Sequence, residues 1–458
     1  MKNIYIRAGL SPLDNMHPAK MLLDNAIGEN VGNLVYAYSI FRALMVDDDT
    51  TITPNYYKAR PDDADKINEK YDAFIIPLAD AFRPQFMGEL RNITNLVKRL
   101  NIPCVVTGVG LRAPFETEID KDFGYEFDED VKNFVKAVLD KSAMIGVRGQ
   151  LTADYLSSLG FIEGKHHTVI GCPSMYTFGR ELKIRETNLT PESRVCVNNN
   201  VLCPDSVQNF LERSMQAIPD HYYLPQRLPE FRLVYTGAPY VHSQDLENFP
   251  CRMTDRLYKE DRVRFFANIP TWLDFLREAD LSFGCRLHGN VAATIAGTPS
   301  LFVPHDARMR ELVDYHKFPH IWAKDIDEKT DIFELFAKTD FQSVTKGHRE
   351  RFDHYIDFLD KNGLDHIYKN GANPTEAPLD RKMKEIDLHP MIKTIRGISF
   401  EEMIERFDAY YPNEYKRINK LRTEVKKLRA DNAQLKASKL NDAAKKSFAG
   451  KVMKIFKR

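Results

Sequence analysis

Four consecutive residues, Arg286, Leu287, His288 and Gly289, stand where a buried strand (281–284) is predicted to end and a helix to begin. The first turn of a helix presents free backbone N–H groups and the positive end of the helix dipole, so it suits an anion. Arg286 adds a guanidinium fork that fits a carboxylate or phosphate, and His288 adds a titratable donor. Gly289 allows a ligand to approach the backbone closely. The pattern therefore predicts an anion-binding site, although a structural arginine beside a packed histidine would give the same short string.

Regular alternation of strands and helices must position these residues. Continuous apolar strands separated by helices are typical of parallel sheets covered on both faces. In the first part of the chain we predict strands at 3–7, 73–77, 103–108, 144–147 and 168–171. In the second part we predict strands at 194–197, 232–235, 262–266, 281–284 and 300–303. Two such doubly wound halves would place a ligand cleft between the carboxyl ends of their strands.

The predicted fold class is therefore α/β, with two doubly wound Rossmann-like domains in a GT-B-like layout and a C-terminal helical extension. We place an N-terminal Rossmann-like domain at 1–182, a donor-binding Rossmann-like domain at 194–365, a linker at 366–399 and the helical extension at 400–458.

Composition limits the partners and the compartment. The 458 residues include 65 Lys and Arg against 65 Asp and Glu, so no overall positive field is present to hold nucleic acid. The six cysteines are scattered without a C-x-x-C pair, which favours reduced thiols in the cytoplasm. The N-terminal run 1–7 meets a charge too soon to be a signal peptide, and no window of about 20 residues is apolar enough to span a membrane. We expect a cytoplasmic protein that does not bind nucleic acid.

The run around the anion site resembles the C-terminal signature of the polysaccharide pyruvyl transferase family. In that signature a strand leads into G-x-R-x-H-G, a helix and A-G-x-P, which residues 284–289 and 296–299 match. The later residues Asp306, Arg308 and Glu311 are similar to a D-x-R-x-x-E extension found in one branch of the family.

The N-terminal part agrees with the same family at three places. Residues 28–33 resemble an early N-x-G-D loop, with Asn33 where the acid is usual. Residues 145–149 resemble an R-D turn, with Gly149 in place of the acid, and residues 169–174 resemble a G-C-P-S strand end. The resemblance covers about the first 365 residues, and the two missing acids put the role of those loops in question.

The resemblance implies a transferase that moves a pyruvyl group from phosphoenolpyruvate to two hydroxyls of a saccharide, in surface or exopolysaccharide biosynthesis. The acceptor would be a saccharide or a lipid-linked saccharide, with no metal and no cofactor beyond the phosphoenolpyruvate donor. His288 and Glu311 are then the candidate catalytic acid and base. The candidate donor-binding residues are Arg148, Arg286, Leu287, His288 and Gly289. The candidate acceptor or cleft residues are Asn30, Gly32, Asn33, Arg112, Asp306 and Arg308.

Two other functions fit the same sequence. A glycosyltransferase with a nucleotide-sugar donor would use the same scaffold, because a fold does not fix a function, but it would need an apolar slot for the base. A non-catalytic scaffold dimerised through its C-terminal helix is the third reading. The intact Arg286 and His288 argue against that scaffold, while the departures at Asn33 and Gly149 favour it.

The C-terminal extension carries two patterns of its own. Alternating spacings of three and four residues connect Ile418, Leu421, Val425, Leu428, Asn432 and Leu435, which is the a/d seam of a coiled coil. We expect a homodimer through 418–435; the alternative is one amphipathic helix packed on its own domain.

Residues 436–458 hold eight basic residues and one acid, with an apolar face at helical spacing. This tail predicts peripheral contact with the inner face of a membrane, the alternative being a solvated basic tail.

Overall fold

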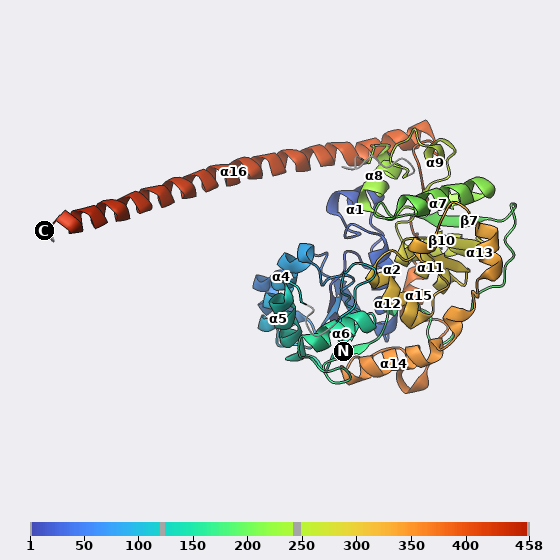
Figure 1. The fold of residues 1–458 in the computed structure, drawn as a ribbon, viewed down its shortest axis with the longest axis horizontal. Coiled ribbons are helices and arrows are strands. Elements are labelled where there is room, and N and C mark those ends of the chain that lie inside the picture. Colours follow the sequence, from blue (N-terminus) through green and yellow to red (C-terminus); the bar gives the residue numbers. More distant parts are fainter. Residues whose placement is uncertain (1, 120–123, 241–248, 456–458) are drawn as a thin grey trace. The chain divides into compact units, whose positions relative to one another are not determined.

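The structure is a computed structural model that describes residues 2–119, 124–240 and 249–455, with side chains up to residue 437. Residues 1–399 form one compact unit and residues 400–458 form a second. The first unit contains both of the sheets that the strand pattern predicts, together with the helices that cover them (Figure 1).

The N-terminal sheet has four parallel strands in the order β2-β1-β3-β4. Its strands are β1 (Asn3–Ile6), β2 (Thr51–Pro54), β3 (Ala73–Pro77) and β4 (Cys104–Thr107). A further parallel pair, β5 (Ile145–Val147) and β6 (His167–Val169), continues beyond β4 through a bridge between Val109 and Val147. All residues of β3 and β4 are buried, as expected for strands covered on both faces.

The C-terminal sheet also has four parallel strands, in the order β11-β10-β7-β8. Its strands are β7 (Val195–Asn198), β8 (His221–Tyr223), β10 (Leu281–Gly284) and β11 (Ser300–Phe302). A short antiparallel pair, β9 (Arg264–Phe265) and β12 (Ile392–Lys393), lies next to β8 through a bridge between Tyr223 and Val263.

Each sheet has one point where the strand order reverses direction. In the N-terminal sheet the chain passes from β1 outward to β2 and then returns to β3 on the other side of β1. In the C-terminal sheet it passes from β7 outward to β8 and returns to β10 on the other side of β7. Ligands of open α/β sheets bind at the carboxyl ends of such strand pairs. The topology therefore predicts a ligand site at the loops that follow β1, β3, β7 and β10.

Helices cover both sheets (Figure 1). Those of the N-terminal part are α1 (Pro18–Asp24), α2 (Gly32–Leu44), α3 (Ala64–Lys70), α4 (Met87–Arg99), α5 (Asp128–Leu139) and α6 (Gln150–Ser158). Those of the C-terminal part are α7 (Asp205–Ala217), α8 (Leu228–Thr236), α9 (Arg256–Lys259), α10 (Ile269–Arg277), α11 (Leu287–Ala296), α12 (Ala307–His316), α13 (Ile332–Lys338), α14 (His348–Lys361) and α15 (Pro378–Lys384). Helices α4 and α5 pack side by side, and α2 packs against α11.

The fold class predicted from the sequence is confirmed: two parallel α/β parts are followed by a helical extension. One predicted strand was wrong, because residues 232–235 lie within helix α8. A proline in the first turn and the Glu230 carboxylate, which accepts a hydrogen bond from the Arg227 backbone N–H, start a helix there. A short apolar run cannot by itself distinguish a strand from a buried helix. The domain boundaries within residues 1–399 stay predictions.

The second unit is one helix, α16 (Phe400–Ile455), with Pro412 inside it. Most of the basic tail predicted at 436–458 lies outside the residues whose side chains are described. None of the described helices has an apolar stretch long enough to cross a membrane.

The segment 366–399, expected to be a linker, contains α15, which packs on α2 through a buried ion pair. The Arg42 side chain is 1% exposed, and its Nε and Nη2 donate to Asp380 at distances between 2.8 and 3.1 Å. Arg42 also donates to the Thr177 carbonyl, 2.8 Å away. Because the guanidinium is buried, its charge depends on this carboxylate for compensation.

Replacing Asp380 by Ala should therefore lower the free energy of unfolding by about 3 kcal/mol or more, since a buried charge is left without its counter-ion. Urea denaturation followed by circular dichroism measures the change. Glu334→Ala is the matched control, because its partner Lys338 and Glu334 itself are each about 70% exposed or more and such pairs contribute less than about 1 kcal/mol. Equal losses in the two variants would contradict this account.

Candidate functional site

A cavity of about 630 Å³ lies where the reversal points of the two sheets face each other; we name it the central cavity. It is lined by loops that follow β1, β3, β7 and β10 and by the first turns of α2 and α12. Six arginines line it: Arg7, Arg83, Arg112, Arg227, Arg286 and Arg308. Among the described residues, three carboxylates do so, those of Glu29, Asp80 and Asp306. The excess of positive charge suits a ligand with more than one anionic group.

Arg286 is held by the carboxyl end of the neighbouring strand β7. Its backbone N–H donates to Asn198 Oδ1 at 2.7 Å, and its Nε donates to the Asn199 carbonyl at 2.7 Å. Its Nη2 is buried and has no hydrogen-bond partner among the described residues, with Glu230 Oε2 3.9 Å away. The guanidinium is therefore fixed in orientation beside the central cavity, which Arg286 lines.

Gly284 allows this close approach of β10 to β7. Its φ of +137° lies in a region that favours glycine, and a Cβ there would lie 1.8 Å from the Asn198 carbonyl oxygen. Gly289 has a similar role, because a Cβ at that position would lie 2.3 Å from Gln226 Nε2. Gly289 thus packs against a neighbouring loop, whereas the sequence suggested that it leaves room for a ligand.

The buried carboxylate of Glu230 lies next to the Arg286 guanidinium. Glu230 is fully buried and accepts hydrogen bonds from the Tyr223 hydroxyl at 2.7 Å and from the Arg227 backbone N–H at 2.9 Å. These bonds fix the carboxylate near the Arg286 guanidinium, so Glu230 is a positioning residue for that arginine. Sequence reasoning missed Glu230, because its partner Arg286 is distant in the sequence.

Three arginines converge on Asp80, in the loop after β3. Asp80 Oδ2 lies 2.8 Å from Arg83 Nη1, 3.4 Å from Arg308 Nη1 and 4.0 Å from Arg112 Nη1. Arg308 also contacts Asp306, whose Oδ2 lies 3.2 Å from its Nη2. One carboxylate thus meets three guanidinium groups, and this corner of the central cavity is left with excess positive charge.

His288 lies in the first turn of α11, against the first turn of α2. A Cβ at Gly32 would lie 2.7 Å from His288 Cβ, so only glycine permits this contact. The imidazole stacks on the Tyr36 ring with centroids 6.3 Å apart, and its Nε2 lies 3.7 Å from Cys172 Sγ. Burial lowers the pKa of His288 well below its ordinary value, and the charges of Arg148 and Arg308 lower it further. The imidazole is therefore neutral near pH 7.

Arg148 lies behind His288 and does not line the central cavity. It is fully buried, its Nε donates to the Gly108 carbonyl at 2.7 Å, and its guanidinium lies 5.3 Å from the centre of the Tyr36 ring. Its Nη1 and Nη2 have no hydrogen-bond partner in the described part of the chain. Arg148 acts on the site through its charge, which reaches His288 and Glu311.

Glu311 caps helix α6, whose N-cap residue, Gly149, has no side chain. Glu311 Oε2 accepts a hydrogen bond from the Thr152 backbone N–H at 3.0 Å, and both carboxyl oxygens lie 3.0 Å from Thr152 Oγ1. A Cβ at Gly149 would lie 2.5 Å from Glu311 Cβ. The carboxyl group that an acid at 149 would supply to the helix is thus provided by α12 of the C-terminal part.

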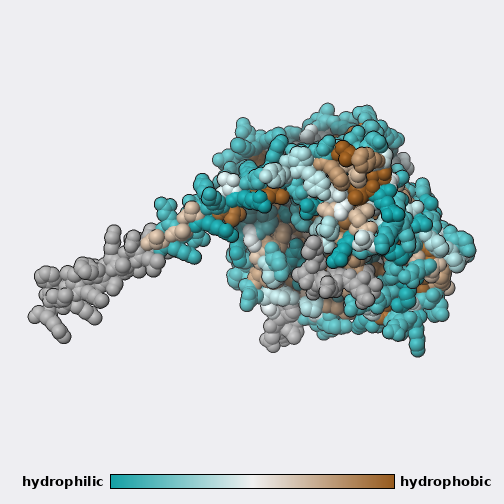
Figure 2. Space-filling view, turned by 90° about the horizontal axis from the view of Figure 1, so that it is seen from above, coloured by the Kyte–Doolittle hydropathy of each residue, from teal (hydrophilic) through white to brown (hydrophobic). Residues whose placement is uncertain are grey.

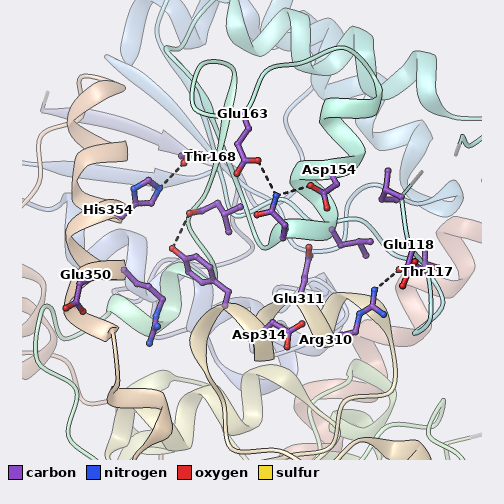
Figure 3. Close-up of a pocket in the computed structure, with 16 residues that line it drawn as sticks. Thr117, Glu118, Asp154, Glu163, Thr168, Arg310, Glu311, Asp314, Glu350 and His354 are labelled. Atoms are coloured by element: carbon purple, nitrogen blue, oxygen red, sulfur yellow. Dashed lines mark hydrogen bonds between the residues drawn. The ribbon is translucent and has the colours of Figure 1, made fainter. Parts of the chain in front are cut away.

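Glu311 lines a different cavity, of about 980 Å³, which we name the side cavity (Figure 3). In Figure 3 Glu311 lies on α12, with Arg310 and Asp314 close by. Burial raises the pKa of Glu311 to about 7, against the opposing effects of the Thr152 hydrogen bonds and of Arg148. The group is therefore close to half-protonated at neutral pH.

The loop 28–33 joins the two sheets at the edge of the central cavity. The Val31 backbone N–H donates to the Gln226 carbonyl at 2.8 Å. Asn33 Nδ2 donates to the carbonyls of Ile27 and Gly28, which an aspartate could not do. This explains the amide at a position where the resemblance leads one to expect an acid. Asn30 Oδ1 accepts from the Gly32 backbone N–H at 2.8 Å and fixes the start of α2.

The structure thus gathers most of the predicted site residues around one cavity. Those that line the central cavity are Asn30, Asn33, Arg112, Arg286, His288, Asp306 and Arg308. Those that do not are Gly32, Arg148, Leu287, Gly289 and Glu311. Sequence reasoning missed Arg7, Asp80, Arg83, Asn200 and Arg227, although each follows a strand or starts a helix. Their place after a strand or at the start of a helix is the signal that could have found them.

The raised pKa of Glu311 predicts a pH-dependent stability. The folded protein keeps the proton up to about pH 7, whereas the unfolded chain loses it near pH 4.3. Stability should therefore fall as pH rises from about 4.5 to 7, by on the order of 3 kcal/mol from this group. Urea titrations at both ends of the window should show a smaller fall for Glu311→Gln than for wild type. The same fall in stability in Glu311→Gln as in wild type would contradict the assignment of this pH dependence to Glu311. Glu334→Gln, at an exposed position of α13, is the control.

A family model described as polysaccharide pyruvyl transferase matches residues 29–307, and no curated protein matches the chain. Among solved structures, a UDP-GlcNAc 2-epimerase from Neisseria meningitidis is 11% identical, with 79% of this chain and 100% of that chain covered and a TM-score of 0.42. A glycosyltransferase from Streptomyces nogalater is 11% identical, covering 79% and 95%, with a TM-score of 0.29.

An uncharacterised protein from Klebsiella pneumoniae is 13% identical, covering 66% of this chain and 96% of that chain, with a TM-score of 0.34. The family match spans more than half of the 458 residues and includes residues 29–33, Arg148, Arg286 and His288. The chain belongs to the polysaccharide pyruvyl transferase family.

Proposed function

We propose that this protein transfers a pyruvyl group from phosphoenolpyruvate to two hydroxyls of a saccharide in the central cavity. The observation that carries the proposal is the charge of that cavity, with six arginines against three carboxylates. Phosphoenolpyruvate carries a carboxylate and a phosphate on a small carbon frame, so it needs several fixed cations close together. The family membership supports the same reaction class.

The reaction is balanced without a redox partner. C3 of the enol takes one proton and becomes a methyl group, which makes C2 electrophilic. One acceptor hydroxyl adds to C2, the C2–O bond to phosphate breaks, and a second hydroxyl closes the cyclic ketal. Of the two hydroxyl protons released, one balances the proton added to C3 and the other leaves with phosphate. The protein must therefore bind two anionic groups, position a diol and move protons.

Arg286 and the first turn of α11 are our candidates for one anionic group, because Arg286 lines the central cavity and is held rigidly. The corner with Arg112 and Arg308 is our candidate for the other. A bound phosphate or carboxylate would there share three guanidinium groups with Asp80. Electrostatic stabilisation by such fixed groups is often the largest catalytic contribution.

His288 fits the role of base in this scheme. Because its imidazole is neutral, it has an unprotonated ring nitrogen that can accept the proton of an acceptor hydroxyl. Burial and the charges of Arg148 and Arg308 make the resulting imidazolium less stable, so His288 is a weak base that readily gives the proton up again. The sequence suggested Glu311 as the other catalytic group. The Glu311 carboxylate accepts a hydrogen bond from the Thr152 backbone N–H and lines the side cavity, so its position favours a structural role. A part for Glu311 in catalysis stays a prediction.

The direct test is to incubate the purified protein with phosphoenolpyruvate and a panel of saccharides and lipid-linked saccharides. Phosphate release that depends on both the donor and one acceptor, with a pyruvate ketal seen by NMR, is the expected result. A chelator should leave the rate unchanged, because we propose no metal. Transfer of a sugar from a nucleotide sugar, without any pyruvylated product, would replace this proposal by the glycosyltransferase reading.

Replacing Arg286 by Lys keeps the charge but removes the planar fork and its bond to Asn199. We expect a loss of about 2 kcal/mol in transition-state stabilisation, which is about a thirtyfold fall in kcat/KM. The protein should still fold. Arg91→Lys is the matched control, since that arginine pairs with Asp130 on the exposed faces of α4 and α5. Wild-type kcat/KM in the Arg286 variant would remove Arg286 from the donor site.

A further inference from the structure

Helix α16 exposes a continuous row of apolar side chains. Ile418, Leu421, Val425, Leu428 and Leu435 each have between 38% and 65% of their surface exposed. In Figure 2, apolar surface appears among hydrophilic residues along the coloured stretch of this helix. Isolated surface leucines are ordinary, but a row at three- and four-residue spacing on one face of a helix is typical of a seam that another helix covers.

The same spacing continues toward the start of the helix. Phe400, Ile404, Phe407 and Tyr411 fall on the a and d positions that Ile418 and Leu421 define. Glu414 is the one non-apolar residue at these positions before Asn432. Helix α16 is continuous over this whole range, with Pro412 inside it. A heptad row drifts around a straight helix by about 20° per heptad, so it stays in contact with a partner when the two helices supercoil.

Charges beside the seam determine which pairing it can form. The three e positions from Arg422 onward are all basic: Arg422, Arg429 and Lys436. The g positions of the last two heptads, Glu424 and Asp431, are both acidic. In an antiparallel pair e faces e, so the basic residues would repel each other. In a parallel pair each g residue faces the e residue of the next heptad.

We propose that α16 pairs with α16 of a second copy of this chain as a parallel, in-register coiled coil through 418–435. In that arrangement Glu424 meets Arg429 of the second copy and Asp431 meets Lys436. Only Arg417 opposite Arg422 is unfavourable. Asn432, at an a position, meets Asn432 of the second copy in this register alone, so its amide is paired within the seam. The two catalytic units are thereby joined at one end of each chain.

Disulfide trapping in the full-length chain tests direction and register. Leu421→Cys and Leu435→Cys are two heptads apart at d positions, and each single variant should form a disulfide-linked dimer under mild oxidation. Antiparallel pairing can bring at most one of these residues opposite itself. Ala430→Cys, at the outer f position, is the control and should link far more slowly. The wild-type chain, with its six native cysteines, sets the background.

Charge exchange tests the pairing by a second route. Sedimentation equilibrium should show a wild-type dimer at micromolar concentration, and Glu424→Lys with Asp431→Lys should raise its dissociation constant at least about tenfold at low salt. Adding Arg429→Glu and Lys436→Glu should restore the dimer. A wild-type monomer, failure of this restoration, or linking of Ala430→Cys as fast as the d-position variants would overturn the proposal.

Discussion

The dominant constraint in this structure is the concentration of positive charge in the central cavity. Guanidinium groups that face one another without enough carboxylates would spread apart unless the backbone holds them. Here fixed partners hold two of them: Asn199 and Glu230 hold Arg286, and Asp306 and Asp80 hold Arg308. Since the two reversal points of the sheets bring these loops together, the topology places a preorganised anion site where the ligand of an α/β fold is expected.

Contacts between the two sheets keep this site closed on one side. His288 lies against Gly32, Asp80 contacts Arg308, and Glu311 caps α6 at Gly149. The last contact explains one departure from the family pattern, because the carboxyl group absent at 149 is supplied from α12. The amide at Asn33 has a comparable explanation in its two carbonyl partners. Neither departure removes one of the six arginines that line the central cavity.

Much of the fold follows from the sequence, because buried parallel strands are continuous apolar runs that end in glycine or polar residues. Strands β3 and β10 were predicted with their observed bounds. Strand β8, His-Tyr-Tyr, was missed because three residues carry too little pattern, and 232–235 was misassigned because its run is short and apolar. Arg286 and His288 could be predicted from local context. Asp80 and Glu230 could not, because their partners are distant in sequence and only packing brings them together.

The central claim is that the central cavity uses phosphoenolpyruvate as a pyruvyl donor. The most direct measurement runs the reaction in deuterium oxide and examines the methyl group of the saccharide product by NMR and mass spectrometry. The account predicts a ketal whose methyl group carries one solvent-derived deuterium, because C3 of the donor takes one proton during transfer. A product with no added deuterium, or a saccharide that gains a sugar and no pyruvyl group, would contradict it.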